Sequence, residues 1–216
     1  RLEFFAANGP FSAVRAICAE AYAGTEHRRL LCLAPEYLLV LDELASDAPH
    51  RFTWVYHNRG TTVRSPDLAL APGVVDEGFV GAEYVEQVRT GTTPEMLRMA
   101  FEDGDLTTWL IMAAGGETAV TVGDGVGASR RDRVPLVMAS RHGPEARFTA
   151  VLEPTRSDQP PRVGAVACSV AGETLAVRID RDGEADRLEV APVEGRAGEG
   201  AHVPRLRFWR GPDLVL

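Results

Sequence analysis

Residues 50–61, HRFTWVYHNRGT, place three aromatic side chains, Phe52, Trp54 and Tyr56, on alternate positions. Alternate residues of an extended strand point to the same face, so these three rings share one face of a strand. Aromatic residues on a single face are typical of a strand that packs on a core. A platform that stacks on sugar rings is the alternative, and it requires the rings to be exposed. The stretch therefore predicts a core strand that ends in a polar tip at residues 57–59.

Similar alternation recurs along almost the whole chain. The alternating segments cover residues 2–8, 12–22, 26–34, 50–58, 79–89, 96–102, 105–113, 117–122, 134–141, 146–153, 162–170, 173–180 and 186–191. Segment 37–44 is instead apolar on both faces, as expected of a central strand that is covered on both sides. Turn-forming Gly, Pro, Asn and Asp residues separate many of these segments, and only the Ala-rich segment 12–22 is ambiguous with a helix. We predict an all-β fold, a layered antiparallel β-sandwich of about 12–15 strands with little or no helix.

The length and composition fit one globular unit. The chain has 216 residues, 45% of them apolar, and begins at Arg1. We expect a single β-sandwich domain over residues 1–216, cut from a longer protein, in which residues 195–216 form a terminal strand or tail. No run of about 18 apolar residues is present, so we expect no membrane span.

The charge balance argues against nucleic acid as a partner. All 23 basic residues are arginine and 31 residues are acidic, which gives a net charge of −8. Proteins that bind nucleic acid need a positive field, and this chain lacks one overall. A local group of arginines can still hold an acidic ligand.

Three cysteines are too few, and odd in number, for a disulfide framework. If Gly24 and Thr25 turn a hairpin, Cys18 and Cys32 fall near each other across it. One disulfide bridge and three small buried thiols are the two alternatives.

Asp42 stands out within the apolar segment 37–44. It shares a face with Leu38, Val40 and Leu44, which predicts partial burial, and a buried carboxylate requires a partner. Arg28 or Arg29 on the preceding strand is the expected partner.

A metal site built from His27, Asp42 and His57 is the alternative role for this carboxylate. Zinc needs three or four converging ligands, and this spacing matches no known metal motif. We therefore favour the ion pair.

Two other stretches have only a superficial likeness to functional motifs. Residues 123–127, GDGVG, lack the following helix of a phosphate loop, so a hairpin turn with a basic flank is favoured over an anion-binding loop. Residues 140–142, Ser-Arg-His, offer a hydroxyl and an imidazole without a sign of the acid and oxyanion hole that nucleophilic catalysis needs.

Residues 23–61 resemble the C-terminal β-sandwich region of heparinase II/III-like polysaccharide lyases, a family that includes alginate and oligoalginate lyases. Four features carry the resemblance: Arg28-Arg29 opening an apolar strand, the segment 37–42 (YLLVLD), Pro49-His50, and the segment 54–57 (WVYH). Residues 2–5, 109–111 and 148–154 fit the same region. The resemblance covers roughly residues 1–191.

The resemblance implies a parent enzyme in which an (α/α) toroid precedes the sandwich. Such lyases cleave uronate-containing polysaccharides by β-elimination: a base removes the proton alpha to the carboxylate, a neighbouring group neutralises the carboxylate, and an acid protonates the leaving oxygen. The expected partners are therefore the upstream toroid of the same parent chain and an acidic polysaccharide or oligosaccharide. A secreted or periplasmic location is implied, with a cytoplasmic one left open.

The family's catalytic segments are missing. Its His-x-His and His-Asn-Thr segments are absent, and residues 57–59, His-Asn-Arg, follow a different strand from the latter. No catalytic or metal residue is carried over, and we expect no cofactor in this chain; any zinc belongs to the upstream part of the parent. The expected substrate-binding residues are His57, Asn58 and Arg59, because they lie at a strand end and Arg59 can pair with a uronate carboxylate.

A stand-alone carbohydrate-binding or adhesion module is the competing function. It predicts a line of exposed aromatic side chains, for which Tyr22, Tyr84, Trp109 and Trp209 are the candidates. Trp109 alternates with Thr107 and Ile111, a pattern that favours burial.

Overall fold

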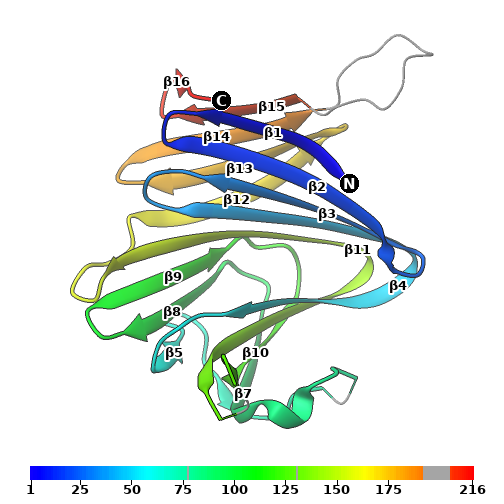
Figure 1. Ribbon diagram of the computed structural model, residues 1–216, viewed down its shortest axis with the longest axis vertical. Helices are drawn as coiled ribbons and strands as arrows, with labels where there is room; N and C mark the ends of the chain where they lie inside the picture. The colour runs from blue at the N-terminus through cyan, green and yellow to red at the C-terminus, as the bar shows by residue number, and fades with distance from the viewer. Residues whose placement is uncertain (77, 130, 192–204) are drawn as a thin grey trace.

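A computed structural model of the chain describes residues 1–76, 78–129, 131–191 and 205–216. These residues form two antiparallel sheets and one 3-10 turn, η1 (Ala82–Tyr84) (Figure 1). The prediction of an all-β, layered antiparallel fold is confirmed.

The larger sheet has eleven strands, and most of them follow the order β1-β2-β3-β4-β11-β10-β7-β6, with β9, β8 and β5 branching from β11. They are β1 (Leu2–Asn8), β2 (Phe11–Tyr22), β3 (Thr25–Leu33), β4 (Leu38–His57), β5 (Thr62–Arg64), β6 (Ala71–Pro72), β7 (Glu86–Thr93), β8 (Leu97–Asp103), β9 (Leu106–Met112), β10 (Thr118–Val126) and β11 (Arg133–Arg156).

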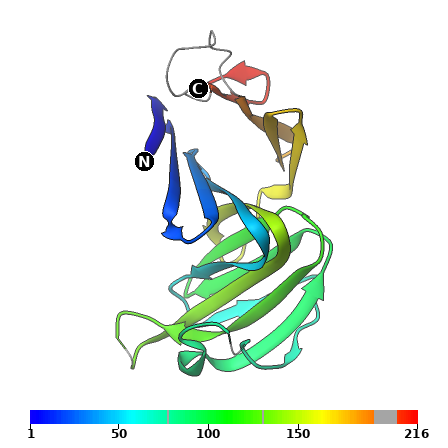
Figure 2. The ribbon, with the colours of Figure 1, turned by 90° about the vertical axis from the view of Figure 1, so that its right-hand side faces the viewer.

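The smaller sheet is a simple meander of five strands in chain order. They are β12 (Val163–Ala171), β13 (Thr174–Arg181), β14 (Glu184–Ala191), β15 (Arg205–Arg210) and β16 (Asp213–Leu214). Figure 2 shows this sheet facing β1–β3 as a second layer, at the end of the molecule that carries both termini.

The two long strands, β4 and β11, hold the molecule together. They pair from Leu38↔Leu152 to His57↔Leu136, with an irregularity between Gly143 and Glu145 where β4 contributes extra residues. Such a bulge bends a strand and lets one ladder continue in a new direction. The first half of β4 pairs with β3, whereas the second half pairs only with β11 among the described strands.

Two cores lie on opposite faces of this ladder. Leu39 and Leu41 point into the first core, between the two sheets, which also contains Ile179 and Phe208. Val40 points into the second core. An apolar run with no alternation is expected of a strand covered on both faces, so the prediction for residues 37–44 is confirmed.

The second core lies within the folded larger sheet. Phe52 and Trp54 are buried there, 7% and 6% exposed, and Tyr56 packs against them. The prediction that these rings belong to a core is confirmed, and they form no exposed sugar-stacking platform.

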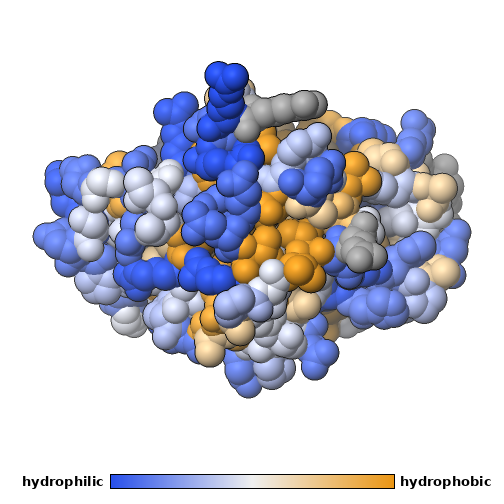
Figure 3. All heavy atoms as spheres, turned by 90° about the horizontal axis from the view of Figure 1, so that it is seen from below, coloured by the Kyte–Doolittle hydropathy of each residue, from blue (hydrophilic) through white to orange (hydrophobic). Residues whose placement is uncertain are grey.

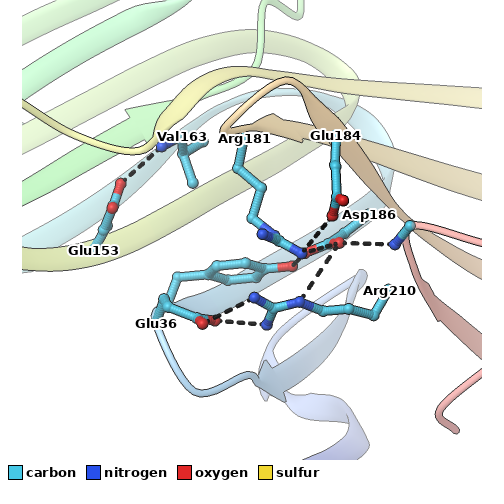
Figure 4. A network of polar contacts seen from close by, with 9 residues as sticks. Glu36, Glu153, Val163, Arg181, Glu184, Asp186 and Arg210 are labelled. Atoms are coloured by element: carbon cyan, nitrogen blue, oxygen red, sulfur yellow. Dashed lines mark hydrogen bonds and ion pairs between the residues drawn. The ribbon is translucent and has the colours of Figure 1, made fainter. Parts of the chain in front are cut away.

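A buried polar network fastens the smaller sheet to the segment before β4 (Figure 4). Asp186 is fully buried and accepts hydrogen bonds from Tyr37 Oη at 2.7 Å and Arg181 Nε at 2.7 Å. Arg210 pairs with both carboxylate oxygens of Glu36, at 2.5 and 2.8 Å. A fully bonded buried network fixes one arrangement of its elements, so it sets how the sheets face each other.

Several predicted elements differ from the structure. Segments 37–44 and 50–58 are parts of the single strand β4, and segments 134–141 and 146–153 are parts of β11. Most of segment 79–89 is not a strand; it contains turns and η1, and β7 begins only at Glu86. Its apolar residues instead cover a small third core around Leu136 and Met138.

The glycine-rich stretch 123–127 is mainly strand, not a turn. Gly123 and Gly125 lie in β10, which pairs with both β7 and β11. Neighbouring groups come so close that a Cβ on Gly123 would lie 2.7 Å from the Glu86 carbonyl oxygen. These glycines therefore let neighbouring groups pack closely against β10. The turn follows at residues 127–132, of which Arg130 lies outside the described residues.

The hairpin of β2 and β3 does not bring Cys18 and Cys32 together. Cys18 pairs with His27, whereas Cys32 pairs with Ala13. All three cysteines are free. The expected hairpin exists, but its register excludes the bridge.

Candidate functional site

Two pockets lie on opposite faces of the β3–β4 pair. In the register of these strands Arg29 is opposite Asp42, and Arg28 is opposite Glu43. Neighbouring residues of a strand point to opposite faces, so the two pairs diverge. The Asp42 pocket has a volume of about 650 Å³ and the Glu43 pocket about 640 Å³.

The Asp42 carboxylate is the centre of the first pocket. It is 1% exposed, and each of its oxygens has two hydrogen-bond partners. Oδ1 lies 2.5 Å from His27 Nε2 and 2.7 Å from Arg29 Nε, and Oδ2 accepts bonds from Arg29 Nη2 and Trp54 Nε1, each at 3.0 Å. The prediction that Asp42 is buried with an arginine partner is confirmed, and that partner is Arg29.

These partners keep Asp42 ionised. Burial alone raises the pKa of a carboxyl group, because it disfavours the charged form. Hydrogen bonds from His27 and Arg29 more than offset burial, so the pKa of Asp42 lies below its ordinary value. The cluster is therefore a stable pair of a carboxylate and a guanidinium, joined by one imidazole.

The rest of the Asp42 pocket is aromatic and basic. Its wall includes Tyr22, His50, Arg51, Phe52 and Phe79. Tyr22 is 63% exposed, whereas Phe52 belongs to the second core. Arg51 is held by an ion pair with Asp76. Asp42 is the only carboxylate among the described residues that line this pocket.

The Glu43 pocket differs in its charges. Glu43 pairs with Arg15 at 2.6 Å and with Arg147 at 3.7 Å, while Arg28 pairs with Glu26 at 2.6 Å. Glu117 and Glu145 also line the pocket. Of the described arginines that line this pocket, all but one pair with a glutamate.

That exception is Arg141, which is only 8% exposed. It donates to neutral acceptors: the hydroxyl of Thr118 at 2.9 Å, the carbonyl of Ala113 at 3.0 Å and the carbonyl of Arg147. Burial lowers the pKa of its guanidinium. Gly115 lies against it so closely that a Cβ would come 2.3 Å from Nη1. Arg141 therefore holds the loop between β9 and β10 in place.

The predicted substrate-binding tip lies elsewhere, at the far end of β4. His57, Asn58 and Arg59 line neither pocket. The Asn58 backbone N–H bonds to Pro135 at 3.2 Å, and Arg59 is exposed. Partial burial of the His57 ring lowers its pKa. The assignment of His57, Asn58 and Arg59 to substrate binding stays a prediction.

The described residues do not fit a metal site. His57 lies on the opposite face of β4 from Asp42, and no three His, Cys, Asp or Glu side chains converge within the described ranges. In addition, both Asp42 oxygens are already occupied by Arg29, Trp54 and His27. The alternative site at His27, Asp42 and His57 is not formed.

Two contacts at these sites were missed by the sequence reasoning. The Trp54 indole reaches Asp42 across the bend in β4, and Thr53 bonds to Ser140 at 2.8 Å. A shared face for Trp54 and Asp42 follows from their even spacing, but only the bulge brings them into contact. No sequence signal marked Arg141 as a buried structural residue.

Comparisons with known proteins agree with this architecture. The family model described as "Heparinase II/III-like, C-terminal" matches residues 9–164. No curated protein sequence matches the chain.

Solved structures with the same fold include a heparan sulfate lyase HepC mutant from Pedobacter heparinus, at 10% identity and a TM-score of 0.57 over 88% of this chain and 27% of that one. The heparinase III-BT4657 gene product is similar at 15% identity and a TM-score of 0.55, again over 88% and 27%. The chain thus spans about a quarter of the length of these proteins.

Proposed function

Because the chain belongs to the heparinase II/III-like family as its C-terminal domain, we propose that it is the β-sandwich of a larger polysaccharide lyase. In that parent it braces an upstream (α/α) toroid and walls the substrate cleft. The observation that carries the proposal is the family match over residues 9–164, on a fold that recurs as one part of much longer lyases.

The proposed reaction of the parent is β-elimination on a uronate-containing polysaccharide. It needs a base for the proton alpha to the carboxylate, a group that neutralises the carboxylate and an acid for the leaving oxygen. We assign none of these roles to a residue of this chain, and any zinc belongs to the upstream part of the parent. The chain supplies a rigid surface beside the reaction.

An exposed apolar surface supports the docking role. Seen from below, apolar side chains gather near the middle of the molecule (Figure 3). Val74 and Val80, in the segment before β7, are 80% and 97% exposed. Exposed apolar surface of this kind often marks a contact with another protein surface. We propose that the upstream toroid covers apolar surface of this kind.

The stand-alone carbohydrate-binding module has less support. It requires several exposed aromatic rings in a line. Tyr22 is 63% exposed and Tyr84 is 38% exposed, but Trp109 is only 9% exposed, which confirms its expected burial. Of the four candidates, Tyr22 is the one that lines the Asp42 pocket.

Within the parent, we propose that His57, Asn58 and Arg59 contact the polysaccharide. Arg59 is exposed at a strand end and is suited to a bidentate bond with a uronate carboxylate. Arg59→Ala in the parent should raise KM with little change in kcat. Unchanged KM and kcat would contradict this role.

The proposal as a whole is tested by a lyase assay on the parent enzyme. The substrates are alginate, heparan-type and other uronate polymers, and the product is followed by the ultraviolet absorbance of the unsaturated uronate. The polymer that yields product identifies the substrate. No activity on any polymer, from a folded parent, would favour the binding module instead.

A further inference from the structure

We propose that the Asp42 pocket binds the carboxylate or sulfate group of an acidic sugar unit, through Arg29, His50 and Tyr22. This inference rests on the proposed function for the polymer that brings the sugar, but the site itself belongs to this chain. It is separate from the tip at residues 57–59, which does not line the pocket.

The first observation is a guanidinium held in place with unused bonding capacity. Arg29 Nε and Nη2 both donate to Asp42, which fixes the plane of the group. The third nitrogen, Nη1, has no partner among the described residues, and the Arg29 side chain is 49% exposed. A pre-oriented, half-exposed guanidinium can bind an oxyanion without first losing much freedom.

The second observation is the excess of donors over acceptors. Arg29, His27 and His50 supply donors at the wall, against a single lining carboxylate among the described residues. Arg51 also lines the pocket, but it is already paired with Asp76. The lining carboxylate, Asp42, is 1% exposed and accepts four hydrogen bonds, so neither of its oxygens is left free at the pocket wall. An anion meets no repulsion from a free carboxylate of the described wall.

The third observation is the shape and the aromatic content of the wall. A volume of about 650 Å³ lies in the range of small-molecule sites, which run from about 300 to 1,000 Å³. Tyr22 is exposed at the wall, and Phe79 lines it as well. Aromatic rings pack against the C–H faces of a sugar ring. A pocket of this size and lining has room for at least one acidic sugar unit.

The test is an NMR titration of the isolated chain, labelled with 15N, with three probes: glucuronate, glucose 6-sulfate and uncharged glucose. We expect saturable shifts for at least one acidic probe, centred on residues 25–29 and 50–55 and on the Arg29 side-chain Nε–H. Glucose should give none. Comparison of the two acidic probes identifies whether a carboxylate or a sulfate is preferred.

Matched variants localise the effect. Arg29→Lys keeps a positive charge beside Asp42 but removes the free Nη1, and Tyr22→Ala removes an exposed ring. Each should weaken binding roughly tenfold, as the loss of one charge-assisted bond or one stacked ring does. Arg28→Lys is the control, because Arg28 is the neighbouring residue on the opposite face and lines the Glu43 pocket.

Three outcomes overturn the inference: no saturable shift with either acid, equal shifts with glucose, or a loss of binding in Arg28→Lys that matches Arg29→Lys. These failures are distinct from failure of the proposed function. If the isolated chain binds neither acid but the parent enzyme is active, only the pocket proposal is refuted. If the isolated chain binds the acids but the parent enzyme is inactive, only the lyase proposal is refuted.

Discussion

The Asp42 pocket and the Glu43 pocket share two strands and have nearly the same volume, yet their carboxylates differ in burial and in their partners. Asp42 and Glu43 are adjacent in β4, and their cross-strand neighbours Arg29 and Arg28 are adjacent in β3. Asp42 is buried and accepts four hydrogen bonds, whereas Glu43 is partly exposed and forms ion pairs with Arg15 and Arg147.

The difference shows how one strand pair makes two environments. A buried carboxylate has to be fully bonded, so its partners are locked and the surrounding surface is left with donors. A half-exposed carboxylate is solvated and can exchange partners, so glutamates and arginines accumulate together. The first arrangement is suited to an anionic ligand; the second is suited to holding strands together.

The largest expected effect is on stability. Asp42→Ala removes the acceptor of Arg29, His27 and Trp54 and should lower the free energy of unfolding by about 3 kcal/mol, the lower range for breaking a buried ion pair. The melting temperature should fall by roughly 10 °C. Glu43→Ala, the adjacent control, should cost about 1 kcal/mol or less. Equal losses in calorimetry would remove the distinction between the two pockets.

The next largest effect is expected on the stability of the folded chain in acid. The pKa of Asp42 is lower in the folded state than in the unfolded state. Its contribution is therefore complete above the ordinary carboxyl pKa, near 4, and is lost as the pH falls through the lower folded value. Melting temperatures measured from pH 6 to pH 2 should fall less steeply in Asp42→Asn than in the wild type. A parallel fall would show that Asp42 does not contribute to acid unfolding.

Thiol chemistry gives a smaller, local test. Cys18, opposite His27, is exposed, whereas Cys168 at the Glu43 pocket is partly buried and its pKa is raised mainly by burial. Burial also raises the pKa of Cys32 to about 12. Alkylation at pH 8 followed by mass spectrometry should label Cys18 first and Cys32 only on unfolding. Rapid labelling of Cys168 would mean that the Glu43 pocket is more open than the structure shows.

The smallest effect concerns the tip of β4, outside both pockets. Because partial burial lowers the pKa of His57, its imidazole signals should titrate below the ordinary histidine value of about 6.5. An NMR titration measures this directly. Since the folded pKa is the lower one, the small stability contribution of His57 is present above about pH 6.5 and declines as the pH falls. A pKa at or above 6.5 would contradict a partly buried ring.

Alternation along the sequence is sufficient to predict most of the strands and the environment of Asp42. Leu38 and Val40 share its face, and that shared face indicates both burial and the need for an arginine partner. The aromatic core face of residues 52–56 follows from the same period. Local spacing determines which face a side chain takes, and these predictions need nothing more.

Spacing along the sequence does not show which residues a bend in a strand brings into contact. The bulge near Gly143 joins two predicted segments into β11 and brings Trp54 onto Asp42, and neither result depends on a local signal. The same limit applies to segment 79–89. Its apolar residues look like a strand, but they pack as a cover on Leu136 and Met138, and Gly81 takes a left-handed φ of 96° that interrupts extension.

The proposed division of labour between the upstream toroid and this sandwich is tested by a side-by-side lyase assay of the parent enzyme and of residues 1–216 alone, at equal molar concentration on the same uronate polymer. We expect unsaturated uronate from the parent and none from the isolated chain, because we propose that the chain supplies a wall and a sugar pocket and that the base and the acid lie upstream. Product formation by the isolated chain would contradict this division, and would place the catalytic residues within this sandwich.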